Sequence, residues 1–314
     1  MEIDWSEHYL RKGSPDEPAY YIIRSNISTR GLFCHFNVFA GRIKYALERG
    51  FVPVIDMQNF PNLYLPNELL GKENAWEYYF RQPLGIGLKT AYNGENVLLS
   101  EGQDLDFPNR PHAEVMRSFD NKPDGFLAQF RMLVKLGLLR IKPEIQAEID
   151  VTYKKLFVPT DRVLGVFLRG TDYVARRPHA HAIPPPLEYA LTHVVLKINE
   201  WQCNKIFLVT EDKEIVAAFK DFFGNFCVTT EKNYVNYDGQ KGIGFYNSDR
   251  PNDKFLRGKE YLMDIAILAK LDYLVAARTN GSLGAMILKT DGYKDLLIFN
   301  FGLYNLISPQ EFLT

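Results

Sequence analysis

The chain has 314 residues, of which 46% are hydrophobic and 24% charged, an ordinary composition for a globular enzyme. This length exceeds the usual size of one hydrophobic core, so we expect two domains of roughly 150 residues each. A net charge of −1 without a long basic block argues against a nucleic-acid partner. The sequence has no apolar run of about 18 residues and no signal peptide at its start, which predicts a cytoplasmic location and no transmembrane segment.

Strand and helix patterns alternate through the first half of the chain. In chain order the predicted elements are a strand at Tyr20–Ser25, a loop and helix up to Gly50, strands at Phe51–Asp56 and Glu95–Glu101, and helices between Ala113 and Phe157. Gly50 is suited to close the first helix, because glycine accepts the left-handed backbone found after helix ends. Pro143 suits the first turn of the last helix.

The second half repeats this alternation and predicts a second α/β domain. In chain order it holds a strand at Val163–Leu168, a helix from Leu187, a strand at Lys205–Thr210, a helix at Glu214–Gly224, a short strand at Phe226–Thr230, a helix at Gly258–Lys270, a strand at Asp272–Ala277, a helix at Ser282–Lys289 and a strand at Asp295–Asn300. Apolar strands between helices indicate parallel sheets covered on both faces. We place the boundary near Val158–Asp161, which gives Rossmann-like domains at residues 1–158 and 159–314.

Unusual polar clusters follow three of the predicted strands in the second half. They are Arg169, Thr171 and Asp172 after the first, Glu211 and Asp212 after the next, and the segment Ala277–Ala285 after a third. In open α/β sheets ligands bind beyond the carboxyl ends of the strands, so we expect these clusters to meet in one crevice.

Each cluster has a structural alternative. Arg169 and Asp172 suit an ion pair that holds a loop, although a planar guanidinium also fits a phosphate through two hydrogen bonds. The stretch Thr279–Ser282 suits a turn that opens a helix, and the amide groups of such a helix start also bind anions. Glu211 and Asp212 favour the first turn of the following helix electrostatically.

Other cofactor motifs are missing or weak. The sequence has neither a GxGxxG between a strand and a helix nor a GxxxxGK[ST] phosphate loop. Asp104–Asp106 match the DxD of metal-dependent glycosyltransferases, and His179 with His181 suggest zinc, but both pairs lie in polar or proline-rich loops where solvated side chains are the commoner explanation. Three cysteines without CxxC spacing predict reduced, mostly buried thiols. We therefore predict no metal site.

Three segments of the second half resemble a known family. They are VLGVFLRGTDYV (Val163–Val174), IFLVTEDKEIV (Ile206–Val216) and YLMDIAILAKLDYLVAARTNGSLGAMI (Tyr261–Ile287). In order and spacing they resemble the donor-site motifs of the fucosyltransferase superfamily, which includes bacterial nodulation, core α1,6-, α1,2- and protein O-fucosyltransferases. The family's first motif runs His-x-Arg-Arg-(Thr/Gly)-Asp, and here Phe167 stands at the histidine position.

The resemblance implies a GT-B fold, in which two Rossmann-like domains face each other across a crevice. It implies transfer of fucose from GDP-fucose to a glycan acceptor in polysaccharide biosynthesis, inverting and without a metal or other cofactor. The partners would be the nucleotide sugar, bound by residues 159–314, and the acceptor, bound by residues 1–158. Peripheral association with membrane-bound glycan assembly would fit this role.

The resemblance also implies roles for individual residues. Arg169 and Asp172 would be catalytic, with Arg169 also binding the β-phosphate of the donor. Asp264 would read the guanine edge, and the alternative is a structural hydrogen bond to a neighbouring loop. The phosphates would be held by four consecutive residues, Thr279, Asn280, Gly281 and Ser282. A segment similar to the family's glycine-rich N-terminal loop and the helix after it would contribute Gly31, His35 and Asn37 to acceptor or donor binding.

Three questions stay open from the sequence. The general base is Asp172, Asp56 or His35. The aromatic segment Asn62–Pro83 either stacks acceptor sugars or forms a satellite core. Because Phe167 replaces the motif histidine, a transferase for another nucleotide sugar and a non-catalytic nucleotide-sugar-binding protein are the alternative functions.

Overall fold

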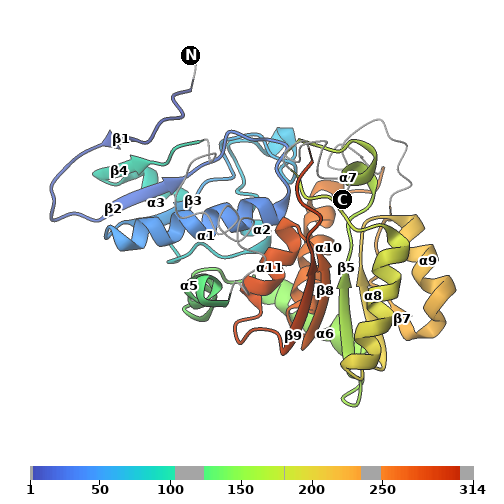
Figure 1. Ribbon diagram of the computed structural model, residues 1–314. Coiled ribbons are helices and arrows are strands. Elements are labelled where there is room, and N and C mark those ends of the chain that lie inside the picture. Colours follow the sequence, from blue (N-terminus) through green and yellow to red (C-terminus); the bar gives the residue numbers. More distant parts are fainter. Residues whose placement is uncertain (1–2, 103–123, 180, 235–248, 305–314) are drawn as a thin grey trace, which may run out of the picture. The chain divides into compact units, whose positions relative to one another are not determined.

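The structure, a computed structural model, describes residues 3–102, 124–179, 181–234 and 249–304 (Figure 1). The chain forms two compact units, which we call the first unit (Met1–Ala147 with Ser248–Leu262) and the second unit (Glu148–Asn247 with Met263–Thr314). The domain boundary at residues 158–159 stays a prediction, because compactness alone does not say which segments fold independently.

The first unit contains a four-stranded sheet and several helices. Its elements are β1 (His8–Arg11), β2 (Ala19–Ile23), α1 (Leu32–Glu48), β3 (Val52–Ile55), the short 3₁₀ helix η1 (Asn67–Leu69), α2 (Trp76–Tyr79), α3 (Leu88–Asn93), β4 (Asn96–Leu99) and α5 (Asp124–Lys135), while α6 (Pro143–Leu156) and α10 (Asp253–Leu268) pass from one unit into the other. The strand order is β1-β4-β2-β3, with β2 parallel to β3 and β4. The antiparallel edge strand β1 was not predicted, because its residues are mostly exposed and show no apolar pattern.

Helix α1 is the central helix of the first unit. Twelve of its 17 residues are buried, so the chain packs against it on nearly all sides. The helix ends as predicted, since Gly50 follows it with a φ of 73° in the left-handed region. At the other end, the backbone amide of Leu32 donates a 2.6 Å hydrogen bond to the Tyr64 hydroxyl. The tyrosine thus satisfies an amide that would otherwise lack a partner at the helix start.

The second unit contains a five-stranded parallel sheet. Its elements are β5 (Val163–Phe167), α7 (Thr171–Ala175), α8 (Leu187–Glu200), β6 (Lys205–Val209), α9 (Lys213–Phe223), the 3₁₀ turn η3 (Gly224–Phe226), β7 (Cys227–Val228), β8 (Tyr273–Ala277), α11 (Asn280–Leu288) and β9 (Asp295–Phe299). The strand order is β7-β6-β5-β8-β9, and every neighbouring pair is parallel. The parallel α/β sheet predicted for this half of the chain is therefore confirmed.

Helices cover both faces of the second sheet (Figure 1). Side chains alternate between the two faces of a strand, and Leu164, Val166 and Leu168 pack on one face in a cluster with residues of α8 and α9. On the other face, a methyl group at Gly165 would lie 2.7 Å from Leu268 of α10, so the helix and the strand approach closely there. In the part of the chain that is described, no helix is long and apolar enough to cross a membrane.

Candidate functional site

The register of the second sheet places the predicted clusters along one edge. Phe167, the last residue of β5, is in register with Val209 of β6 and Ala276 of β8. Neighbouring strands lie about 4.8 Å apart, so the segments that follow these three strands begin side by side. This edge holds Arg169 after β5, Glu211 after β6 and the start of α11 after β8.

Arg169 lies between two carboxylates. Its Nη2 atom donates to Asp172 Oδ1 at 3.1 Å, and its Nε atom is 3.2 Å from Glu211 Oε1. The three side chains are 16–18% exposed, so the pairs are shielded from water but still accessible. The guanidinium also lies 4.7 Å from the ring centroid of Tyr173. Since these contacts come from two different segments, the direction of the arginine side chain is tightly fixed.

A second set of contacts joins the segment after β5 to the start of α9. Asp212 accepts the backbone amide of Thr171 at 2.9 Å and also caps α9 by accepting the amides of Glu214 and Ile215. A methyl group at Gly170 would lie 2.0 Å from the Asp212 carboxylate oxygen, so a larger residue would have to displace this carboxylate. Thr171 has a φ of 48°, and its hydroxyl donates to Glu211 at 3.0 Å. The short helix α7 that starts here was not predicted from sequence.

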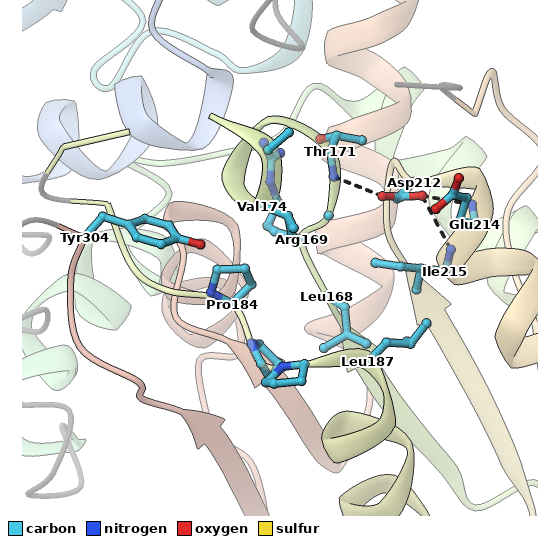
Figure 2. Close-up of a pocket in the computed structure, with 14 residues that line it drawn as sticks. Leu168, Arg169, Thr171, Val174, Pro184, Leu187, Asp212, Glu214, Ile215 and Tyr304 are labelled. Atoms are coloured by element: carbon cyan, nitrogen blue, oxygen red, sulfur yellow. Dashed lines mark hydrogen bonds between the residues drawn. The ribbon is translucent and has the colours of Figure 1, made fainter. Parts of the chain in front are cut away.

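A cavity of about 470 Å³ opens beside Arg169 in the second unit (Figure 2). Its walls come from the segment after β5, the proline run Pro184–Pro186, the start of α9 and Tyr304. Among the described residues, Arg169 is the one predicted site residue that lines this cavity. The predicted clusters after β5, β6 and β8 therefore share an edge of the second sheet, whereas Gly31, His35 and Asn37 belong to the first unit, and the cavity does not gather all of these residues.

Asp264 is buried and already has two partners. Its Oδ1 atom accepts the Thr230 hydroxyl at 2.5 Å, and its Oδ2 atom forms an ion pair with Lys232 Nζ. Burial alone would lower the pKa of Lys232, but the charge and hydrogen bond of Asp264 outweigh it, so this pKa is raised. The structural alternative for Asp264, a hydrogen bond to a neighbouring loop, is thus present in the structure. Lys232 was missed by the sequence reading, although it follows β7 at the same edge of the sheet.

Thr279 to Ser282 form a capping box at the start of α11. The Thr279 hydroxyl accepts the Ser282 amide at 3.1 Å, and the Ser282 hydroxyl accepts the Thr279 amide at 2.9 Å. The Ser282 hydroxyl is also 2.8 Å from the Ala277 carbonyl oxygen, so this side chain is committed to the helix start. The turn predicted as the structural alternative is therefore present, and anion binding at this helix start stays a prediction.

Gly31, His35 and Asn37 lie at the start of α1, where the predicted loop runs into its helix. Gly31 is the N-terminal cap, while His35 and Asn37 are 1% and 0% exposed within the helix. Neither ring nitrogen of His35 has a hydrogen-bond partner among the described residues. Burial, together with the nearby positive charge of Arg30, holds the pKa of His35 well below 6.5. A role of these residues in ligand binding stays a prediction.

Asp56 and the aromatic segment Asn62–Pro83 both have structural roles. Asp56 accepts the backbone amides of Gln58 and Asn59 and the hydroxyl of Tyr92, so its carboxylate holds a turn. In the aromatic segment Asn62–Pro83, four of the five aromatic rings are buried, as expected for a satellite core: these are Tyr64, Trp76, Tyr79 and Phe80.

The cysteine and histidine candidates have ordinary surroundings. All three cysteines are free thiols, and burial raises the pKa of Cys203 and of Cys227 to about 11. His181 Nδ1 lies 3.0 Å from the carbonyl oxygen of His179. No group of three metal-binding side chains occurs within the described ranges, and Asp104–Asp106 lie outside them.

Comparison with solved structures shows which fold this is. The chain is similar to NodZ α-1,6-fucosyltransferase soaked with GDP-fucose, with a TM-score of 0.52 and 16% identity over 93% of this chain and 98% of that chain. It is similar to the fucosyltransferase NodZ from Bradyrhizobium, with a TM-score of 0.51, 16% identity and coverage of 93% and 98%. It is also similar to POFUT1 in complex with GDP-fucose, with a TM-score of 0.51, 10% identity and coverage of 91% and 99%.

At these identities the likeness establishes the fold and leaves the reaction to be tested. No family model matches the chain, and no curated protein sequence matches it. The predicted α/β class is nevertheless confirmed, because α/β units with largely parallel sheets match the solved fucosyltransferases over more than nine-tenths of the chain. The arrangement of two domains across a crevice stays a prediction. The chain therefore has the α/β fold of fucosyltransferases such as NodZ and POFUT1.

Proposed function

We propose that the chain is a glycosyltransferase that transfers fucose from GDP-fucose to a glycan acceptor, without a metal. The observation that carries this proposal is Arg169, held by two carboxylates at the carboxyl edge of a parallel sheet, in a fold shared with structures that contain GDP-fucose. Transfer from a nucleotide sugar requires stabilisation of the departing diphosphate, and a fixed guanidinium is suited to that task.

Arg169 is prepared for this role by its carboxylates. A guanidinium has five N–H donors, enough to serve Asp172, Glu211 and a phosphate at the same time. Because the side chain is already ordered, little conformational entropy is lost when the phosphate binds. Asp172 remains the candidate general base because it is 18% exposed beside Arg169, whereas Asp56 and His35 are each only 1% exposed.

In this proposal the nucleotide is bound by Asp264 and by the start of α11. The four residues Thr279–Ser282 would hold the phosphates, helped by the helix dipole. For Asp264 to accept the N1–H and 2-amino protons of guanine, Lys232 must release one carboxylate oxygen. Binding of GDP would then be coupled to movement of the segment that follows β7.

Arg169→Ala tests the proposal. We expect donor turnover to fall by about two orders of magnitude, or on the order of 3 kcal/mol, because one electrostatic contact to the leaving group is lost. Arg169→Lys should restore little, since an ammonium cannot make the two-pronged contact. The matched control is Arg176→Ala, which removes an exposed arginine from the same segment. Wild-type turnover in Arg169→Ala would remove this residue from the mechanism.

Because Phe167 stands at the histidine position of the motif, two alternative functions are also considered. A transferase for another nucleotide sugar would turn over a UDP-, an ADP- or a different GDP-linked sugar in preference to GDP-fucose, and a non-catalytic binding protein would bind GDP without hydrolysing or transferring the donor. Donor hydrolysis assays with GDP-, UDP- and ADP-sugars separate both from the proposal.

A further inference from the structure

We propose that the cavity beside Arg169 binds an uncharged sugar of the acceptor, so that part of the acceptor is recognised by the second unit. This inference rests on the proposed function, because it assigns the second substrate of that reaction. It differs from the expectation that residues 1–158 alone provide the acceptor side.

The cavity has the size and the surface of a sugar site. Its volume of about 470 Å³ lies within the range of small-molecule pockets, roughly 300–1,000 Å³. One part of the wall is apolar and rigid, made by Leu168, Ile215 and the proline run Pro184–Pro186. Figure 2 shows Tyr304 on the opposite side of the cavity from Ile215. Apolar ring surfaces facing polar groups match a sugar ring, which has C–H groups on its faces and hydroxyls at its rim.

The charges of the wall disfavour a diphosphate inside the cavity itself, although Arg169 at its edge keeps donors for a phosphate outside it. One cation, Arg169, faces two carboxylates in the lining, Asp212 and Glu214, so the formal charge of the lining is negative. A diphosphate placed inside the cavity would meet carboxylates at short range, which is repulsive. A neutral polyhydroxyl ligand avoids this repulsion, and carboxylates are good acceptors for its hydroxyl groups.

The side of the cavity that Tyr304 forms is held in place by backbone contacts. Ala182 and Leu303 form an antiparallel bridge. The Ile183 amide donates to the Gly302 carbonyl at 3.0 Å, and the Tyr304 amide donates to the His181 carbonyl at 2.9 Å. The segment that carries Tyr304 is therefore tied to the segment that enters the proline run. A wall built from two paired segments is preorganised for a ligand.

Exposed aromatic rings continue from the same two segments. Tyr189 of α8, two residues beyond the cavity-lining Leu187, is 43% exposed. Its ring centroid lies 5.3 Å from that of Phe301 and 4.0 Å from that of His193. These rings offer a stacking surface for a further sugar residue, which fits a glycan chain better than a single small molecule.

Two variants test the assignment. Ala175→Trp should fill the cavity from its exposed rim, and Tyr304→Ala should remove the aromatic wall. The control is Phe222→Ala, which removes an exposed ring of α9 that does not line the cavity. The probes are methyl glycosides of N-acetylglucosamine, glucose and galactose, observed by saturation-transfer NMR, with GDP affinity measured by calorimetry on the same samples.

We expect at least one glycoside to bind the wild type, and its binding to weaken at least fivefold in both cavity variants but not in the control. GDP affinity should stay within twofold throughout. If no glycoside binds the wild type, or if binding survives both variants, the assignment is wrong. Loss of GDP affinity in Ala175→Trp would show instead that the nucleotide occupies the cavity. If the wild type binds a glycoside but not GDP, the proposal that GDP-fucose is the donor is wrong, and the assignment of the cavity to a sugar is still supported.

Discussion

Breaking the ion pair between Asp264 and Lys232 should destabilise the protein strongly. Asp264 is 1% exposed and Lys232 11% exposed, so the remaining partner would be left charged in a buried environment. Such a loss costs about 3–5 kcal/mol. We therefore expect Asp264→Asn and Lys232→Met each to lower the free energy of unfolding by about 3 kcal/mol, equivalent to a fall of roughly 10 °C in melting temperature.

The double variant distinguishes the energy of the ion pair from the separate effects of replacing its two side chains. With both charges removed, no unpaired charge remains, and we expect about 2 kcal/mol of the loss to be recovered. The assay is urea unfolding at pH 7, with Lys213→Met as the control because that lysine is exposed. Additive losses in the double variant, or single variants within 0.5 kcal/mol of the wild type, would refute the reasoning.

The raised pKa of Lys232 gives an independent readout. A lysine whose pKa is higher in the folded state stabilises the protein fully below the unfolded pKa, about 10.5. That stabilisation is lost as the pH rises through the raised folded pKa. We therefore compare the loss of stability as the pH rises from 10 to the raised pKa of Lys232. Over this interval the wild type should lose more stability than the Lys232→Met variant.

Two further variants test single features of each unit. The low pKa of His35 means that the folded state resists protonation, so stability should be full above pH 6.5 and fall below it by up to about 1.4 kcal/mol per pH unit. His35→Leu should abolish this slope in urea unfolding at pH 7.5 and 5.5, and an unchanged slope would assign acid sensitivity to other groups. Gly170→Ala should destabilise by about 1–3 kcal/mol, because the added methyl group meets Asp212 at 2.0 Å. Gly87→Ala, where nothing lies within 4 Å of the added methyl group, is the matched control, and equal melting temperatures for the two variants would contradict this account.

Local patterns were sufficient to predict much of the fold. The apolar strands of the second half alternate with helices, and the structure shows the parallel sheet that this predicts. Gly50 closes α1, and Pro143 opens α6, because the backbone preferences of these two residues act within one turn. The edge strand β1 and the helix α7 were missed, since both are short and their residues follow no apolar period.

The candidate site was predicted less completely, because its contacts join distant segments. The spacing of Arg169 and Asp172 in the chain was enough to predict that they lie close together. The ion pair between Arg169 and Glu211, in contrast, depends on the register of β5 and β6. Lys232 and Asp264 are separated by 32 positions in the chain, and no local pattern brings them together. The cavity depends on the pairing of the segments around Ala182 and Leu303, which sequence periodicity does not reveal.

The measurement that tests the central claim most directly is the binding of GDP, UDP and ADP to the wild-type protein in the presence of EDTA. If the chain uses GDP-fucose without a metal, GDP at 100 times its dissociation constant should stabilise the protein by about 2.7 kcal/mol, and EDTA should not reduce this effect. UDP and ADP should bind at least tenfold more weakly. Equal affinity for the three nucleotides would contradict the assignment of the donor, and loss of GDP binding in EDTA would contradict the metal-independent mechanism.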